Sequence, residues 1–166
     1  MTDTVQLQGV DATLGRAIAF VWREAELLDR KDYAAWGALW SEDGHYIVPI
    51  DPDSTDYASQ LNYVYDDARM RRLRIERLTS GHSMSAADSA HTVRTVSRFT
   101  LGQVEDDVVE VHSAQLLAAY KRGTLTMFAA NLTHRIRFTA DGARLQQKVV
   151  RLINSHDTLN ALGFLL

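Results

Sequence analysis

The sequence contains no cysteine among its 166 residues. This absence excludes disulfide bonds, thiolate nucleophiles, and every zinc or iron–sulfur centre that this chain would hold through its own cysteines. The six histidines form no HExxH motif and no pair three to five residues apart: His45, His82, His91, His112, His134 and His156. We therefore expect no metal site and no cofactor-binding residue in this chain.

Long apolar runs and an excess of one charge are also missing. No run approaches the ~20 residues that span a bilayer, and the N-terminal MTDTVQLQG lacks the basic start and apolar middle of a signal peptide. The 18 basic and 21 acidic residues give a formal net charge of −3, which creates no global field that attracts nucleic acid. We expect a cytoplasmic protein that binds neither membrane nor nucleic acid.

The sequence predicts three helices, of which the first and the third are amphipathic and the second is shorter. The expected N-cap of the first helix is Asp11 or Thr13, and that of the third, later helix is Asp66 or Asp67. The expected buried face of the first helix is Leu14, Ala17, Ile18, Val21, Trp22, Ala25 and Leu28. The expected apolar stripe of the later helix is Met70, Leu73 and Leu78. Five arginines crowd that later helix beside acidic residues, so we expect it to be solvated or to face a protein partner.

The stretch ALWSEDGHYIVPI, residues 38–50, joins helical and strand patterns. A short helix capped by Asp32 precedes it, and the pair Asp43-Gly44 is expected to end that helix. Residues 45–50 then predict a short strand that pairs at a sheet edge, followed by a polar loop over residues 53–62.

From residue 91 onward the hydrophobic period changes to two. Residues 91–101, 108–122, 123–139 and 145–154 predict four long antiparallel strands, and Asp141-Gly142 is a strong hairpin signal. Helices followed by such a meander indicate an α+β fold over residues 1–166 as a single domain, with N-terminal helices packed on a strongly curved, mainly antiparallel sheet. A sheet of this kind forms a cone whose wide end can hold a ligand.

Three histidines are candidates for chemistry in that cone. His45 with Asp43 forms a possible base and orienting acid, or else a strand start and a turn, and spacing alone leaves both open. By strand parity His112 groups with Leu116, and His134 groups with Ile136. Either histidine could line the cone, or else be a core or outward-facing residue whose hydrogen bonds are made by other groups of the fold.

Six segments in register make the chain resemble a known family. They are FVWREAELLDRKDYAAWGALWSEDGHYIVPI, YDDARMRRLRIERL, TVRTVSRF, FAANLTHRIRF, QQKVVRLIN and DTLNALGFLL. Together they resemble the small (beta) subunit of aromatic-ring-hydroxylating dioxygenases over nearly the whole chain. The resemblance implies a cystatin-like cone, the fold also used by ketosteroid isomerases, scytalone dehydratase and polyketide cyclases.

The same resemblance implies a structural role in an oxidoreductase of aromatic hydrocarbon catabolism, which adds dioxygen across an arene. The partner is an iron-containing large (alpha) subunit, with a homotrimer of this chain inside a hetero-hexamer. The Rieske iron–sulfur cluster, the non-haem iron and the NAD(P)H requirement are implied for the complex, and none is bound by this chain. No catalytic residues are implied for this subunit, and the arene is not named by the sequence.

Two departures from the family pattern keep an alternative open. His91 and Val93 stand where arginines are usual, and Ala130-Asn131 replaces a common Gly-Arg. These changes bear on the partner interface and add histidines to a fold known for histidine chemistry. The alternative is a free-standing isomerase, dehydratase or polyketide cyclase with acid–base residues among Asp43, His45, His91, His112 and His134. A ligand-binding or adaptor protein on the same fold is a third possibility.

The C-terminal LNALGFLL, residues 159–166, carries five large apolar side chains. Because leaving them in water forfeits roughly 1.5–3 kcal/mol each, we expect this segment to be docked on the fold. Apolar residues also occur on both parities of the long strands. One layer of helices covers a single face of a sheet, so we expect a homo-oligomer that covers the other.

Overall fold

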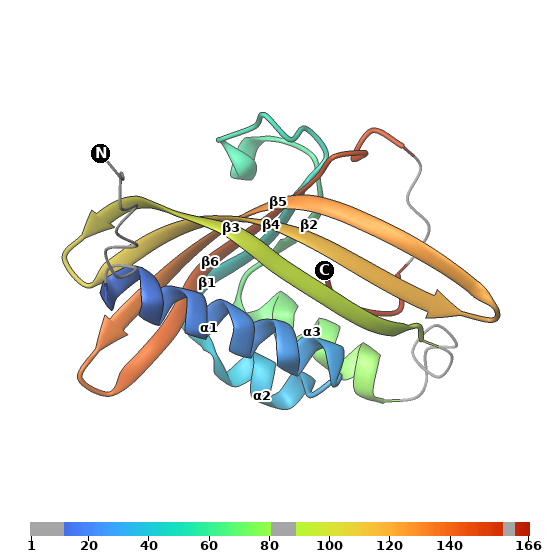
Figure 1. The fold of residues 1–166 in the computed structure, drawn as a ribbon, viewed down its shortest axis with the longest axis horizontal. Helices are drawn as coiled ribbons and strands as arrows, with labels where there is room; N and C mark the ends of the chain where they lie inside the picture. The colour runs from blue at the N-terminus through green and yellow to red at the C-terminus, as the bar shows by residue number, and fades with distance from the viewer. Residues whose placement is uncertain (1–11, 81–88, 158–161) are drawn as a thin grey trace, which may run out of the picture.

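The computed structural model describes residues 12–80, 89–157 and 162–166. The expected α+β fold is confirmed, with the helices gathered on one side of a six-stranded sheet (Figure 1). The elements in chain order are α1 (Ala12–Asp29), α2 (Tyr33–Ala38), β1 (Trp40–Pro49), the 3-10 turn η1 (Tyr57–Ser59), β2 (Asn62–Asp66), α3 (Ala68–Thr79), β3 (His91–Glu105), β4 (Val108–Lys121), β5 (Thr124–Thr139) and β6 (Gly142–Leu152). No helix in these described ranges is long and apolar enough to cross a membrane.

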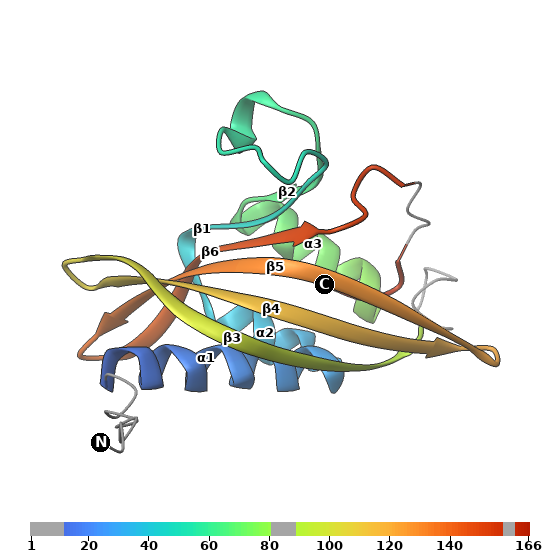
Figure 2. The same ribbon diagram turned by 45° about the horizontal axis from the view of Figure 1, so that its top comes forward.

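The sheet has the strand order β2-β1-β6-β5-β4-β3, and only the pairing of β1 with β6 is parallel. The four predicted long strands are confirmed as β3 to β6, and they curve across the helices (Figure 2). The hairpin between β5 and β6 turns at Gly142, whose φ of +119° suits glycine. The expectation that the first short strand lies at an edge is wrong, because β2 pairs outside β1 and takes the edge position.

A bulge changes the inward face of β3 part-way along. The sequence places residues 91–101 in one alternation, but the pairing with β4 shifts between Ser97 and Thr100, where Arg98 has a φ of +57°. Before the bulge the even positions Thr92, Arg94 and Val96 are buried, and beyond it Phe99 and Leu101 turn partly inward. An extra residue in one strand of a β-ladder has this effect, because beyond it the alternate positions that face the core are exchanged with those that face away.

Helix α1 packs along the edge strand β3. The predicted buried face is confirmed for Ala17, Val21, Ala25 and Leu28, but Trp22 is 57% exposed. Its ring lies over the edge of the sheet, where Nε1 donates to the main-chain oxygen of Val96 at 3.2 Å. Farther along the helix the Asp29 carboxylate accepts the main-chain N–H of Arg94 at 2.9 Å. The proposed cap Asp11 lies outside the described residues.

The helix expected to end at Asp43-Gly44 ends earlier, at Ala38, so that prediction is wrong. Strand β1 starts at Trp40 and contains Asp43, and its register against β6 shifts between Trp40 and His45. Gly44 is required there for close approach, since a Cβ would lie 2.9 Å from both the Leu145 oxygen and the Trp40 ring. Asp-Gly therefore marks a bulge inside a strand here, and not a turn.

Helix α3 starts at its cap Asp67, which accepts the N–H of Met70 at 2.8 Å. Its predicted apolar stripe is corrected, because Met70 and Leu73 are 36% and 39% exposed whereas Leu78 packs on the core. One of the five arginines of the helix expected to be solvated or to face a partner, Arg71, is buried instead. Arg71 lies over the Trp40 ring at 4.3 Å and donates to the main-chain oxygens of Gly44 and Ser41, which fixes the bulged part of β1.

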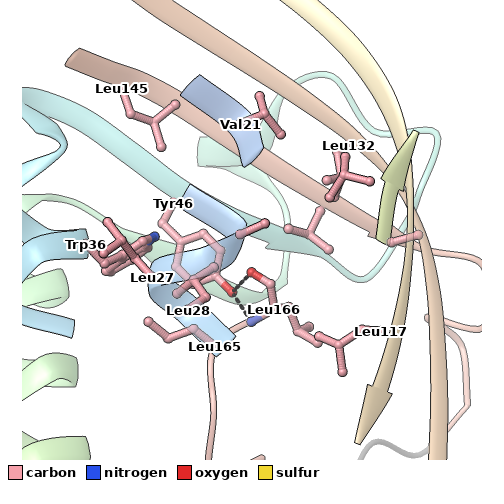
Figure 3. Packing of buried hydrophobic residues seen from close by; sticks show 14 of the residues in the cluster. Val21, Leu27, Leu28, Trp36, Tyr46, Leu117, Leu132, Leu145, Leu165 and Leu166 are labelled. Carbon is pink, nitrogen blue, oxygen red and sulfur yellow. Dashed lines mark hydrogen bonds between the residues drawn. The ribbon is translucent and has the colours of Figure 1, made fainter. Parts of the chain in front are cut away.

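The core lies between the helices and the inner face of the sheet, and the C-terminal segment is part of it (Figure 3). Phe164, Leu165 and Leu166 are 9%, 4% and 5% exposed, so docking of this segment is confirmed for residues 162–166. Residues 159–161 of the same prediction lie outside the described residues. The interior of the cone therefore contains part of the chain itself.

Candidate functional site

A buried carboxylate and a buried imidazole meet inside the cone. His134 comes from β5, where it pairs with Lys148 of β6 across the ladder, and its side chain is fully buried. Its Nε2 lies 2.8 Å from Oε2 of Glu24, which projects from the sheet-facing side of α1. His134 is thus the candidate histidine that lines the cone interior, and its Nδ1 has no hydrogen-bond partner among the described residues.

Lys148 and Trp36 complete the surroundings of Glu24. The Lys148 ammonium and the Trp36 indole N–H both donate to Oε1, at 2.8 and 3.0 Å. Burial by itself raises the pKa of Glu24, but the Lys148 charge and the hydrogen bond with His134 outweigh it and hold that pKa well below its usual range. Burial also lowers the pKa of Lys148, and the Glu24 carboxylate opposes that effect.

A second, partly buried ion pair also contacts the C-terminal segment. Arg94 of β3 donates to the Asp29 carboxylate at 2.8 Å, and Thr92 donates to the same carboxylate at 2.9 Å. The second terminal nitrogen of Arg94 donates to the main-chain oxygen of Leu165 at 2.5 Å, while its Nε has no hydrogen-bond partner among the described residues. Both buried cations therefore contact the C-terminal segment, since Lys148 also donates to the main-chain oxygen of Leu166 at 2.9 Å.

The network is closed to solvent, and its charged groups are paired with one another inside the core. A general base must reach its substrate, and its pKa should lie near the working pH. Glu24 has the opposite character, because it is 2% exposed and three donors surround its oxygens. A hollow of about 600 Å³ lies nearby between α1 and β3, but its lining includes Trp22, Asp29 and Arg94 and none of the candidate histidines.

His112 lies on the other face of the sheet. Its neighbour Val111 is the residue that pairs with His134, so the two histidines point to opposite sides. The His112 ring lies 2.9 Å from Glu110 and 3.3 Å from the Thr133 hydroxyl, and its side chain is 46% exposed. Arg151 also donates to that hydroxyl, at 2.8 Å. Sequence parity left both histidines open, and the structure assigns only His134 to the interior.

Asp43 and His45 contact different strands. The Asp43 carboxylate is mostly exposed and lies 3.5 Å from Arg137 of β5; a hydrogen bond from Ser41, together with that charge, lowers its pKa. The His45 ring lies against the Tyr65 ring of β2 in a tilted arrangement, with centroids 5.3 Å apart. His91 is exposed at the start of β3. His82 lies outside the described residues.

No metal-ligand cluster is found in the described part of the chain, where no three or more His, Asp or Glu side chains gather suitably. Sequence reasoning missed the two charged residues at the centre of the cone, Glu24 and Lys148. The available signal was a carboxylate three residues after Val21 and four before Leu28, on the buried side of an otherwise apolar helix. A charge in that position requires a partner, but the sequence does not say which.

Comparisons with known proteins give one consistent result. Residues 23–158 match the family described as ring hydroxylating beta subunit. The chain is 26% identical to the anthranilate 1,2-dioxygenase small subunit of Acinetobacter baylyi over 140 residues, which cover 81% of this chain and 86% of that protein. It is 27% identical to the biphenyl 2,3-dioxygenase subunit beta of Rhodococcus jostii over 169 residues, covering 93% of this chain and 90% of the relative.

Solved structures agree on the fold. The beta subunit of benzoate 1,2-dioxygenase from Burkholderia mallei superposes with a TM-score of 0.72 at 22% identity, covering 90% of this chain and 95% of that chain. An NTF2-like protein with a cystatin-like fold from Novosphingobium aromaticivorans gives 0.60 at 19% identity, covering 91% and 92%. Identities this low show the fold alone, and they confirm its cystatin-like class.

Proposed function

Because the chain belongs to the ring hydroxylating beta subunit family, we propose that it is the structural small subunit of a Rieske-type aromatic-ring-hydroxylating dioxygenase. In this proposal it assembles with an iron-containing large (alpha) subunit in the cytoplasm and serves aromatic compound catabolism. The family match over residues 23–158 is the observation that carries the proposal. Relatives named as small or beta subunits of dioxygenases, aligned over most of their own length, support it.

The cofactors of such an enzyme belong to the partner in this proposal. A Rieske cluster is held by two cysteines and two histidines, and this chain contains no cysteine. The residues present therefore do not fit the cluster. The non-haem iron and the electrons from NAD(P)H are likewise assigned to the other components of the complex.

We further propose that no residue of this chain is catalytic, including Asp43, His45, His91, His112 and His134. The support for this proposal is the burial of His134 and the separate contacts that Asp43 and His45 make. His134 and Glu24 lie inside a cone that the C-terminal segment fills, whereas Asp43 and His45 contact separate strands. A free-standing isomerase, dehydratase or cyclase needs its acid–base residues at an open pocket.

A patch on the outer sheet face, here called the outer apolar patch, supports assembly of several copies, and we propose a homotrimer within a hetero-hexamer. Its exposed members are Val93, Leu116, Tyr120, Leu125, Met127 and Ile153. The strand register places them side by side on one face, since Tyr120 pairs with Leu125 and Ala118 pairs with both Val93 and Met127. Contiguous exposed apolar surface of this kind marks an interaction site.

Co-expression tests the proposal. The chain carrying an affinity tag is produced together with a Rieske-type large subunit, and the purified material is assayed for stoichiometry, iron content and arene oxidation. We expect a stable complex that contains iron and oxidises the arene only when both chains are present. A chain that stays alone beside its large subunit, or that isomerises or dehydrates a substrate by itself, overturns the proposal.

A further inference from the structure

The C-terminal segment, residues 162–166, is held inside the cone as a ligand is held. None of these residues belongs to a helix or strand, so no β-ladder joins the segment to the sheet. The Phe164 ring packs edge-on against Phe128 of β5, with centroids 5.8 Å apart. Leu165 and Leu166 lie among apolar side chains of α1, β1 and β4 (Figure 3).

Recognition of this segment uses its main chain. The Tyr46 hydroxyl accepts the N–H of Leu166 at 3.1 Å and donates to the oxygen of the same residue at 3.4 Å, as Figure 3 shows. Lys148 donates to that oxygen at 2.9 Å, and Arg94 donates to the Leu165 oxygen at 2.5 Å. Side chains from β1, β6 and β3 therefore converge on the main chain of two consecutive residues, Leu165 and Leu166.

The side chains that form this cradle are positioned by contacts that do not involve the segment. Lys148 is fixed by Glu24 at 2.8 Å, and Arg94 is fixed by Asp29 at 2.8 Å. Tyr46 packs against the Trp36 ring with centroids 5.8 Å apart. A site whose walls are held from behind is preorganised, which reduces the free energy needed to bind a ligand.

We propose that the inside of the cone is a peptide-binding site, which recognises a short apolar peptide and which the chain's own residues 162–166 occupy. The ligand class is a peptide with bulky apolar side chains in which the residue at the position of Leu166 offers both a main-chain N–H and an oxygen to Tyr46. Such a site accepts the same peptide when it is supplied as a separate molecule. This inference does not depend on the function proposed above.

A cleavable version of the full chain tests the proposal. A protease site replaces residues 158–161, the folded protein is cut, and a fluorescent peptide Leu-Gly-Phe-Leu-Leu is added in excess. We expect saturable binding of the labelled peptide, followed by fluorescence anisotropy, as it exchanges with the cut segment. A peptide of the same composition in scrambled order should bind much more weakly, because the apolar side chains no longer match their positions.

A matched pair of tyrosine variants locates the binding. Tyr46→Phe removes the hydroxyl that makes both contacts to Leu166, and we expect about tenfold weaker peptide binding. Tyr33→Phe is the control, because Tyr33 is also buried and its hydroxyl has no partner among the described residues. Equal affinity in the two variants, no exchange, or unfolding on cleavage overturns the proposal.

Hydrogen exchange of main-chain amides in the uncut chain tests the proposal independently. If the segment is a separable ligand, its amides exchange through a local opening that costs less than global unfolding. We expect Tyr46→Phe to speed exchange of the Leu166 amide about tenfold more than it speeds exchange of β5 amides. Exchange of the segment only together with β5 contradicts the proposal, even if the cut chain does not fold.

Discussion

Glu24 is a single carboxylate whose interactions join α1, α2, β5 and β6. Its partners lie 12, 110 and 124 residues away along the chain. Sequence periodicity reports which residues face the core, but it carries no information about contacts at such separations. For this reason strand parity could only name His134 among the residues that might line the cone, whereas the ion pair that surrounds it was not predicted.

Acid should destabilise the fold through Glu24. The folded-state pKa of Glu24 is lowered, so the unfolded chain binds a proton below about pH 5 while the folded chain does not. The free energy of unfolding therefore falls as the pH falls, by up to ~1.4 kcal/mol per pH unit from this one group. Urea unfolding between pH 5 and pH 3 measures the slope.

Two variants of helix α1 show whether Glu24 or another carboxylate causes this pH dependence. Glu24→Gln should flatten the slope, whereas Glu26→Gln should leave it unchanged, because Glu26 is an exposed residue of α1. Since Glu24→Gln also leaves Lys148 buried without its carboxylate, it should cost about 3–5 kcal/mol near neutral pH. An NMR carboxyl signal of Glu24 that titrates near pH 4 contradicts this account.

Changes at Asp43 and His45 should leave turnover of the proposed dioxygenase complex almost intact. Removal of a general acid or base typically costs about a hundredfold to ten-thousandfold in rate. Because the two side chains contact Arg137 and Tyr65 separately, we expect His45→Gln and Asp43→Asn to change turnover per iron by less than about tenfold. A hundredfold loss in a complex that forms with normal yield would mean that this chain takes part in catalysis.

At the scale of elements, local chemistry predicted most of the second half of the fold. Period-two alternation and the Asp-Gly hairpin signal located β3 to β6, because each hairpin is formed by residues adjacent in sequence. The early strands were harder to locate. Strand β2 is only five residues long. The first part of β1 depends on Arg71 of helix α3, which donates to main-chain oxygens of that strand.

Deletion of the C-terminal segment should weaken the whole fold. Phe164, Leu165 and Leu166 are buried, and each contributes about 1.5–3 kcal/mol on transfer from water. A chain that ends at Asn160 should therefore lose several kcal/mol of unfolding free energy, or aggregate. Thermal unfolding followed by circular dichroism measures the loss, and an unchanged melting temperature would show that the segment contributes nothing.

At the scale of the whole molecule, the two faces of the sheet differ in what covers them. The inner face is covered by α1, α3 and the C-terminal segment, while the outer apolar patch is exposed in the isolated chain. Apolar strand parity predicted this outer surface before the fold was known. Its partner was not predictable from strand parity, because exposed side chains report an interface without naming what binds it.

A charge in the outer apolar patch should separate the copies of the chain. Leu116→Glu places a carboxylate at the middle of the patch, and we expect a monomer by light scattering, in contrast to the trimer proposed for the unaltered chain. Leu61→Glu is the control, since Leu61 is 83% exposed just before β2 and lies outside the patch. A monomeric unaltered chain at micromolar concentration, or equal oligomers in both variants, contradicts the trimer.

The capped edge of β3 limits the ways in which copies can add to one another. Trp22 and Asp29 occupy a main-chain oxygen and an N–H that would otherwise pair with a strand from another molecule. Strand-by-strand growth, which has no natural end and leads to fibres, is obstructed on that side. Association through sheet faces can close into a ring of fixed size, so the cap on one edge favours a finite assembly over an open-ended one.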